Sequence, residues 1–264
     1  MDLKKICLEV EKIAAEAAAF IMKESERFDK TKTRSKGLHD FVSYVDLGSE
    51  KIIVEKLSKL LPDSGFLAEE GTSKESESEY CWIIDPLDGT TNFLHNLHPF
   101  SISIALSKGN EIIAGVVYEA GWKETFTAWK NNGAWLNGKK IYVSKTNRLT
   151  DSLIATGFPY SDFSRLSEYL LCMEYLMKNT HGVRRMGSAA IDLAYVACGR
   201  YEGFFEYGLK PWDIAAGAIL IREAGGLVSD FSGNEKNVSG LNIIASNSLI
   251  FHEFHEIVSK FMLI

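Results

Sequence analysis

The sequence predicts a mixed α+β and α/β fold whose two halves differ in pattern near residue 146. In residues 1–146, two amphipathic helical stretches come before apolar runs that alternate with polar residues, as in helices packed on an antiparallel sheet. In residues 147–264, strand-like and helix-like stretches alternate, which indicates a layered α/β half. A chain of 264 residues can form one large domain or two modest ones.

The N-terminal half begins with two predicted helices. Residues 2–28 carry apolar side chains at helical spacing, with lysine and glutamate between them. The basic stretch 30–37 is interpreted either as a solvated loop or as a mobile flap that brings Lys36 to a phosphate site. Asp46 is expected to be the N-cap of the second helix, a role that by itself explains an aspartate at this position.

The predicted strands of this half follow. Residues 66–68 form a short apolar strand that stops at Glu69 and Glu70, and a polar, acidic loop is expected over 72–79. Asn131-Asn132-Gly133 and Asn137-Gly138 are hairpin signals, so an antiparallel meander is expected. Its remaining strands are predicted at 101–106, 111–118 and 124–129.

In the C-terminal half, strands and helices alternate. Asp213 lies at the start of one helix, where the helix dipole alone favours an acid, so a structural and a catalytic role are both open. Strands are predicted at 152–156, 181–186, 201–206, 227–230 and 242–246, and helices at 164–178, 188–198, 212–224 and 248–262.

The segment from Trp82 to Phe93 carries the clearest chemical signal. It is interpreted as a buried strand that stops at Asp85, a tight turn that carries Asp85 and Asp88, and a helix that begins at the threonines. The backbone N–H groups of Gly89, Thr90 and Thr91 would form an anion site at the start of that helix. Two carboxylates beside an anion site suit a divalent cation that bridges to a phosphate. An ordinary Asx turn that caps a helix is the alternative.

Composition and charge exclude several classes of protein. The net charge of −6 argues against non-specific nucleic-acid binding, which requires a basic surface. The four cysteines are far apart and form no CxxC pair, so free thiols in a reducing compartment are expected. Neither a signal peptide nor an apolar run of about 18 residues is recognisable. A cytoplasmic protein without a membrane span is therefore predicted.

Considered together, these motifs resemble the inositol monophosphatase family. The order and spacing agree over nearly the whole chain, and the central motif is highly specific. The matching segments are Glu69-Glu70, Asp85–Phe93, Arg185–Ala190, Phe205–Gly208, Pro211-Trp212-Asp213 and Gly225-Gly226.

This resemblance implies a layered αβαβα fold of the sugar-phosphatase type. It also implies a magnesium-dependent, lithium-sensitive phosphomonoesterase that is often a homodimer and acts on a small phosphorylated substrate. Two or three Mg²⁺ ions are expected in each site. By the resemblance, Glu69, Asp85 and the carbonyl of Leu87 would bind the first ion, and a third ion would reach Glu69 through water. The second ion would lie between Asp85, Asp88 and Asp213.

The resemblance also assigns the other site residues. Thr90 and Asp46 would orient and deprotonate the attacking water, with Glu69 as a further catalytic group, and Gly89 and Thr90 would bind the phosphate. Lys36 would be the lysine of the flap. Substrate hydroxyls would contact Asp88, the backbone at Ala189, and Glu206.

The expected reaction is hydrolysis of myo-inositol 1-phosphate or a related small sugar phosphate. Asn92, in the form Gly-Thr-Thr-Asn, favours this activity over that of nucleotide bisphosphate phosphatases. Fructose-1,6-bisphosphatase and histidinol-phosphate phosphatase activities remain alternatives. An alternative from another class is a metal-dependent regulatory binding protein without turnover.

Overall fold

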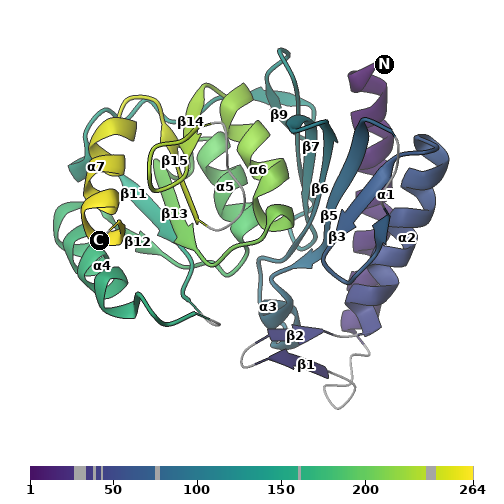
Figure 1. Cartoon of the computed structure of the whole chain (residues 1–264), viewed down its shortest axis with the longest axis horizontal. Coiled ribbons are helices and arrows are strands. Elements are labelled where there is room, and N and C mark those ends of the chain that lie inside the picture. The colour runs from purple at the N-terminus through teal and green to yellow at the C-terminus, as the bar shows by residue number, and fades with distance from the viewer. Residues whose placement is uncertain are drawn as a thin grey trace.

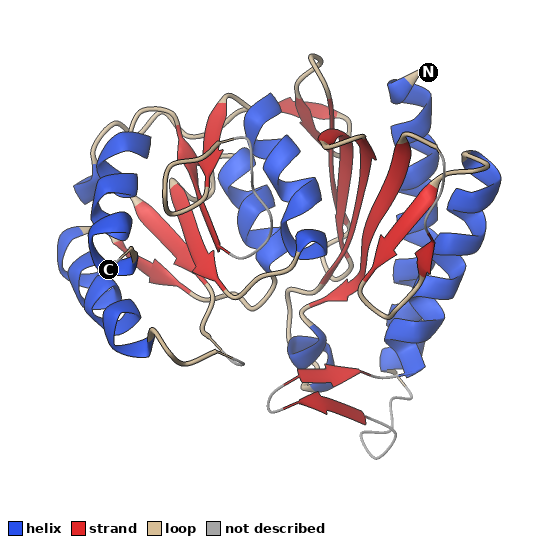
Figure 2. Cartoon of the chain, in the orientation of Figure 1, coloured by secondary structure: helices blue, strands red, loops and turns tan. Residues whose placement is uncertain are grey.

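A computed structural model places the elements in five layers, which alternate between helices and sheets (Figure 1, Figure 2). The layers run from a helix pair, across a large sheet, a central helix pair and a smaller sheet, to an outer helix pair. The predicted αβαβα arrangement is therefore confirmed. The structure describes residues 1–26, 34–37, 40–42, 44–74, 78–159, 162–235 and 242–263.

The large sheet has eight strands in the order β10-β9-β8-β7-β6-β5-β3-β4. Neighbouring strands are antiparallel except for β3 and β5, which are parallel. The strands are β3 (Gly65–Ala68), β4 (Ser73–Lys74), β5 (Tyr80–Asp88), β6 (Ser101–Lys108), β7 (Glu111–Glu119), β8 (Glu124–Trp129), β9 (Ala134–Leu136) and β10 (Lys139–Ile141).

Two helices, α1 (Leu3–Ser25) and α2 (Tyr44–Leu60), cover the outer face of this sheet (Figure 1). The apolar side of α1 is buried on the sheet, as the helical spacing predicts. Below the sheet lie the short helix α3 (Thr90–Leu94) and the two-stranded ribbon of β1 (Arg34–Gly37) and β2 (Asp40–Val42).

The smaller sheet has the order β12-β11-β13-β15-β14. Its strands are β11 (Leu153–Thr156), β12 (Gly182–Arg184), β13 (Gly203–Tyr207), β14 (Gly226–Ser229) and β15 (Asn242–Asn247), preceded by a 3-10 turn at Leu149–Asp151. The outer helices α4 (Leu166–Asn179) and α7 (Phe251–Met262) pack on its far face (Figure 1). Among the described residues, no helix has both the length and the apolar composition needed to cross a membrane.

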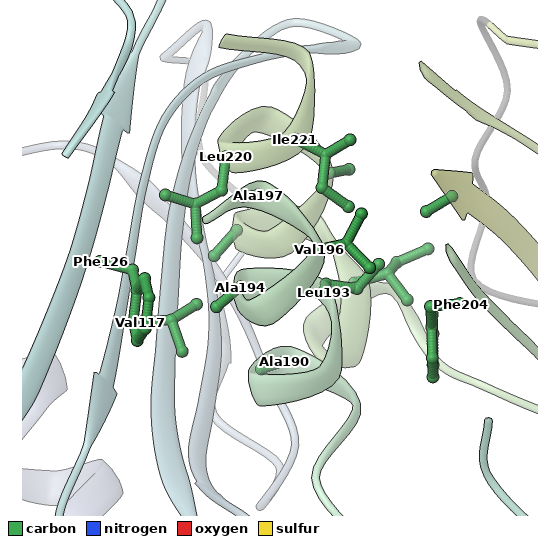
Figure 3. Close-up of a cluster of buried hydrophobic side chains, with 14 of the residues drawn as sticks. Val117, Phe126, Ala190, Leu193, Ala194, Val196, Ala197, Phe204, Leu220 and Ile221 are labelled. Atoms are coloured by element: carbon green, nitrogen blue, oxygen red, sulfur yellow. The ribbon is translucent and has the colours of Figure 1, made fainter. Parts of the chain in front are cut away.

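Helices α5 (Ala189–Ala197) and α6 (Pro211–Glu223) fill the space between the two sheets (Figure 3). Every residue of α5 is buried, as is typical of a helix surrounded by other elements. Small residues allow the two helices to approach closely, since a Cβ on Gly217 would lie 2.5 Å from Cβ of Leu193. Val117 and Phe126 contact this layer from the large sheet and Phe204 from the smaller one. Both halves of the chain thus contribute to one core.

Four local expectations were wrong. Strand β5 does not stop at Asp85 but continues to Asp88, and Asp46 lies inside the first turn of α2 rather than before it. Residues 34–37, expected in a loop, form β1, and the expected loop 72–79 contains β4. The side chain of Lys36 lies outside the described part of the chain, so the flap remains a prediction.

Candidate functional site

The site is built around the end of β5, where the pairing with β6 is interrupted. The register shifts between Asp85 and Asp88, which pair with Ser103 and Ser101. Pro86 has no N–H to donate, so a regular ladder cannot continue through it, and the strand resumes only after the irregularity. The backbone N–H of Leu87 instead donates to Oδ1 of Asp85 over 2.9 Å. The strand was predicted to end at Asp85. The structure instead has a bulge after Asp85, and the strand continues to Asp88.

Helix α3 begins directly after this strand, with Gly89 as its N-cap. Gly89 has φ of 93°, a left-handed conformation that glycine adopts without strain. A Cβ at this position would lie 3.1 Å from the carbonyl oxygen of Gly187 and 3.2 Å from that of Pro99. Glycine therefore lets the backbone of the substrate-side segment, residues 185–190, lie directly on the start of α3.

The hydroxyl of Thr90 links α3 to α2. Its Oγ1 lies 3.0 Å from Oδ1 of Asp46 and 2.9 Å from the carbonyl oxygen of Leu87. Asp46 is buried in the first turn of α2. A hydroxyl has one proton, so Thr90 can donate to only one of these acceptors at a time. The structure thus brings Thr90 and Asp46, the two residues assigned to orient and deprotonate the attacking water, into contact beside the carbonyl of Leu87.

Glu69 comes next to Asp85 because β3 and β5 run parallel. Ala68 pairs with Ile84, and the N–H of Glu69 donates to the carbonyl of Ile84 over 3.1 Å. The turn after β3 is fixed by Glu50 of α2, whose carboxylate accepts from the N–H groups of Glu70 and Thr72. Glu69 is close enough to hydrogen bond with Asp85.

Asp213 reaches the same place from the other half of the chain. It lies in the first turn of α6, as expected, and its Oδ2 accepts from the backbone N–H of Lys210 over 2.6 Å. Its negative charge contributes to the raised pKa of Asp85. Carboxylates from three separate segments therefore face one another.

The electrostatics of this cluster are unfavourable without a cation. Burial raises the pKa of Asp85 well above its usual range, and the charges of Glu69, Asp88 and Asp213 raise it further. Burial, followed by the charge of Asp88, raises the pKa of Asp213 to about 7. The pKa of Asp88 is also raised by burial, although hydrogen bonds from Ser188, Ala190 and Ala189 oppose the change.

These donors fit a hard divalent cation. Carboxylate and carbonyl oxygens are the ligands that Mg²⁺ and Ca²⁺ prefer, and a cation would relieve the mutual repulsion. In the part of the chain that the structure describes, no three acidic, histidine or cysteine side chains already surround one point as a finished metal site does. The fit of this site to a divalent cation therefore rests on its oxygen donors and on the raised pKa values of its carboxyl groups.

A second group of residues, contributed by the C-terminal half, lines a cavity beside this carboxylate cluster. Its lining residues are Asp88, Gly157, Arg185, Gly187, Ser188, Ala189, Asp192, Glu206, Leu209 and Asp213. Glu206 is buried on β13, and its pKa is raised well above the usual range by burial and by the charge of Asp213. Gly157 makes room for Glu206, because a Cβ there would lie 1.9 Å from Oε1. The predicted substrate residues Asp88, Ala189 and Glu206 thus line one cavity.

Two side chains that the sequence did not single out connect the halves of the site. Ser188, the N-cap of α5, donates to Oδ2 of Asp88 over 2.6 Å and lies 3.1 Å from Oγ of Ser101. Nδ2 of Asn92 donates to the carbonyl oxygens of Pro99 and Met186 over 2.7 and 2.8 Å. In the sequence, Asn92 indicated only which class of phosphate ester the protein would hydrolyse. In the structure, its side chain also anchors the substrate-side segment through Met186.

Comparison with known proteins agrees with this geometry. Residues 3–261 match the profile of the Inositol monophosphatase family. The chain belongs to the inositol monophosphatase family. Members of this family are metal-dependent phosphatases, which is consistent with the carboxylate cluster and the adjoining cavity. The family predicted from the sequence is thereby confirmed.

Relatives within the inositol monophosphatase family carry different names. An inositol-1-monophosphatase of Mesorhizobium japonicum is 44% identical over 226 residues, which is 85% of each chain. The Nus factor SuhB of Escherichia coli strain K12 is 42% identical over 235 residues, covering 89% of this chain and 88% of the relative. A solved structure of the Thermotoga maritima IMPase is 37% identical, with a TM-score of 0.89, and covers 100% of this chain and 99% of that one.

Proposed function

We propose that the protein is a Mg²⁺-dependent phosphomonoesterase that hydrolyses myo-inositol 1-phosphate or a related small sugar phosphate. The observation that carries the proposal is the cluster of Asp85, Glu69, Asp88 and Asp213. These four carboxylates come from three separate segments of the chain, and burial together with the charges of Glu69, Asp88 and Asp213 raises the pKa of Asp85. Such a cluster beside a cavity lined by polar groups is the arrangement expected of a metal-dependent active site.

The cation ligands in this proposal are those that the resemblance to the family assigns. Glu69, Asp85 and the carbonyl of Leu87 would bind one ion, and Asp85, Asp88 and Asp213 a second. A third, weaker ion would reach Glu69 through water. Asp85 is the shared ligand because it has the other three carboxylates as neighbours. When bound, Mg²⁺ ions neutralise charge on the transferred phosphoryl group and on the attacking and leaving oxygens.

The water side of the reaction depends on Thr90, Asp46 and Glu69. Oγ1 of Thr90 donates its proton to Asp46, since the carbonyl of Leu87 is assigned to the cation. The lone pairs of that hydroxyl then accept a proton from the attacking water. The water oxygen forms a new bond to phosphorus while the ester P–O bond breaks. The leaving alcohol oxygen takes up a proton from a solvent water, which balances the proton passed to Asp46 and from there to solvent. The N–H groups of Gly89 and Thr90 would bind the phosphate oxygens.

The alcohol part of the substrate would occupy the cavity between β5, β13 and the start of α5. Ser188 and Ala190 already donate to Oδ2 of Asp88, so Oδ1 is the oxygen that would face a cation or a substrate hydroxyl. Glu206 would accept from a second hydroxyl. The N–H of Ala189 contributes a hydrogen bond that lowers the pKa of Asp88, so without substrate it is directed at this carboxylate.

A panel assay tests the function. Phosphate release is measured from inositol, sugar, histidinol and nucleotide phosphates, each with Mg²⁺, with EDTA and with Li⁺. The expected result is release from a polyol or sugar monophosphate that requires Mg²⁺ and is inhibited by Li⁺. Fructose 1,6-bisphosphate or histidinol phosphate as the best substrate would establish one of the alternative activities instead. No release from any ester would contradict the enzyme.

Two of the relatives are named Nus factor SuhB, and this name supports the alternative of a regulatory binding protein without turnover. All of the carboxylates and Thr90 are present in this chain, which favours turnover. The proposal includes a homodimer and a cytoplasmic location. The absence of nucleic-acid binding, expected from the net charge of −6, stays a prediction.

A further inference from the structure

Asp192 is a buried acid that the proposed mechanism does not use. It lies one turn after the N-cap Ser188 of α5, and only 1% of its surface is exposed. Among the described atoms, its Oδ1 has no hydrogen-bond partner. A buried carboxylate oxygen without a donor is costly and uncommon in folded proteins. The position of Asp192 therefore requires an explanation.

The unpartnered carboxylate lines the substrate cavity. Asp192 and Glu206 both belong to its wall, while Asp88 and Asp213 line the part next to the carboxylate cluster. The charges of Glu206 and Asp88 both act on Asp192, which places all three groups near one another. A molecule held in this cavity would thus have both Asp192 and Glu206 within its surroundings.

One cation faces these acids. Arg185 lowers the pKa of Asp88, Asp192 and Glu206, although burial keeps each of them above its usual value. Its guanidinium lies over the ring of Phe158, 5.5 Å from the centroid. Among the described residues that line it, the cavity has four carboxylates and one guanidinium, so it is rich in hydrogen-bond acceptors. Such a cavity favours groups that donate, and it disfavours a second anionic group on the ligand.

We propose that Asp192 is a specificity-determining residue whose carboxylate accepts a hydrogen bond from a substrate hydroxyl, beyond the hydroxyl that Glu206 accepts. The inference rests on the proposed function and narrows it to polyhydroxylated monophosphates. The side chain would act on the alcohol part of the substrate and not on the phosphate. It would therefore contribute to binding and selectivity while leaving the metal ligands unchanged.

The test compares wild type with Asp192→Asn and Asp192→Leu on three esters. These are myo-inositol 1-phosphate, p-nitrophenyl phosphate, which has no hydroxyl groups, and fructose 1,6-bisphosphate. With Asp192→Asn, we expect kcat/KM for the inositol ester to fall roughly fivefold to tenfold, mostly through KM. That is the ratio expected when a charge-assisted hydrogen bond becomes a neutral one. Asp192→Leu should lose more on the same ester.

The other two esters define selectivity. For p-nitrophenyl phosphate, kcat/KM should stay within about twofold of the wild-type value, because this ester has no hydroxyl group that could donate to Asp192. The ratio of bisphosphate to monophosphate turnover should rise, since one negative charge has been removed. Equal losses on both monoesters, or no change in either, would show that Asp192 is structural only. Asp151→Asn, an exposed aspartate outside the site, is the control and should change none of these values.

Calorimetric binding of myo-inositol 1-phosphate to wild type and to Asp192→Asn separates this inference from the proposed function. A wild-type protein that binds the ester without turnover would contradict the phosphatase, yet weaker binding to the variant would still support Asp192. A wild type that binds the ester no better than the variant does would overturn the role of Asp192, even if phosphate were released.

Discussion

The acidic side chains of this protein occupy two contrasting kinds of environment. In the supporting structure, three buried or half-buried acids each accept hydrogen bonds from two or three donors. Glu50 accepts from two backbone N–H groups, and Glu202 accepts from one N–H and the hydroxyl of Thr146. Glu223 accepts from three successive N–H groups at the β8–β9 turn. Each of these carboxylates holds two elements together.

In the site, the acids face one another instead. Burial and like charges raise the pKa of Asp85 well above its usual range and that of Asp213 to about 7. Asp192 carries a buried oxygen without a partner among the described atoms. Buried acids that repel one another destabilise the folded chain even where, as at Asp88, they accept hydrogen bonds. Their concentration in one place therefore points to a cation or ligand that satisfies them. The contrast therefore separates acids that stabilise the fold from acids that serve chemistry.

The largest expected effect comes from Asp85→Asn. Asp85 is the shared ligand of the proposed site, so we expect kcat/KM to fall by about 1000-fold or more, beyond the loss of roughly 10- to 100-fold that follows removal of an outer-shell partner. Stability should be unchanged or higher. Because the pKa of Asp85 is raised in the folded state, ionisation opposes folding as pH rises above about 4, and asparagine removes that term. Steady-state kinetics and thermal melting in EDTA measure both quantities.

The exposed Asp151→Asn substitution is the matched control and should alter neither quantity. Near-wild-type turnover in Asp85→Asn would show that the bridging role is assigned to the wrong residue. A large loss of stability in Asp85→Asn would mean that Asp85 stabilises the fold, as Glu50 and Glu223 do. The distinction between structural acids and acids of the site would then no longer hold for Asp85.

A smaller effect is expected from Mg²⁺ itself. At about 100 times its dissociation constant, an ion that binds only the folded state adds about 2.7 kcal/mol to the free energy of unfolding. For a chain of this size, the thermal midpoint should rise by roughly 5–10 °C. Protons compete for the same oxygens, since the pKa of Asp213 is about 7 and that of Asp85 is raised. The gain should therefore be larger at pH 8 than at pH 5.5.

In metal-free protein, the linkage has a defined sign. A carboxyl with a raised pKa binds more protons in the folded state, so the stability it contributes falls as pH rises from about 4 to about 7. Melting curves in EDTA at a series of pH values, repeated with millimolar Mg²⁺, measure this. Asp85→Asn should lose most of the Mg²⁺ gain, and an unchanged midpoint in the wild type would count against the site.

The layers and the family could be predicted from sequence because they depend on local patterns. Helical spacing in residues 2–28 and the Asn137-Gly138 hairpin signal each require only neighbours in the chain. Both residues of that turn have positive φ, the conformation that this pair favours. The local pattern already indicated Asp85 and Asp88 as cation ligands. The role of Asp213, which its position at a helix start left open, came from the resemblance to the family.

The remaining features depend on contacts between distant segments. The bulge after Asp85 is decided by pairing with β6, and the parallel pairing of β3 with β5 is not encoded in either strand. Ser188 and Asn92 acquire their roles only when the two halves pack together. Asp46 looked like a cap because the start of a helix is known from sequence only to within a few residues.

The smallest expected effect tests the structural side of the contrast. Glu223→Gln leaves Asn131, Asn132 and Gly133 facing one neutral oxygen and an amide that cannot accept. We expect the free energy of unfolding to fall by about 2 kcal/mol, the range for losing charge-assisted hydrogen bonds. Turnover per folded molecule should not change, because Glu223 lies at the far end of α6 from Asp213. Urea unfolding followed by circular dichroism gives the first value.

Glu174→Gln on α4 is the matched control, since Glu174 forms an exposed, solvent-screened ion pair with Lys178 that contributes little to stability. If Glu223→Gln were as neutral as this control, a full set of backbone donors would not mark a stabilising acid. If it instead lost turnover while keeping its stability, an acid outside the carboxylate cluster would belong to the chemistry. Either result would remove the distinction between the two kinds of acid. A loss of stability with unchanged turnover would instead show that Glu223 supports the fold, in contrast to Asp85.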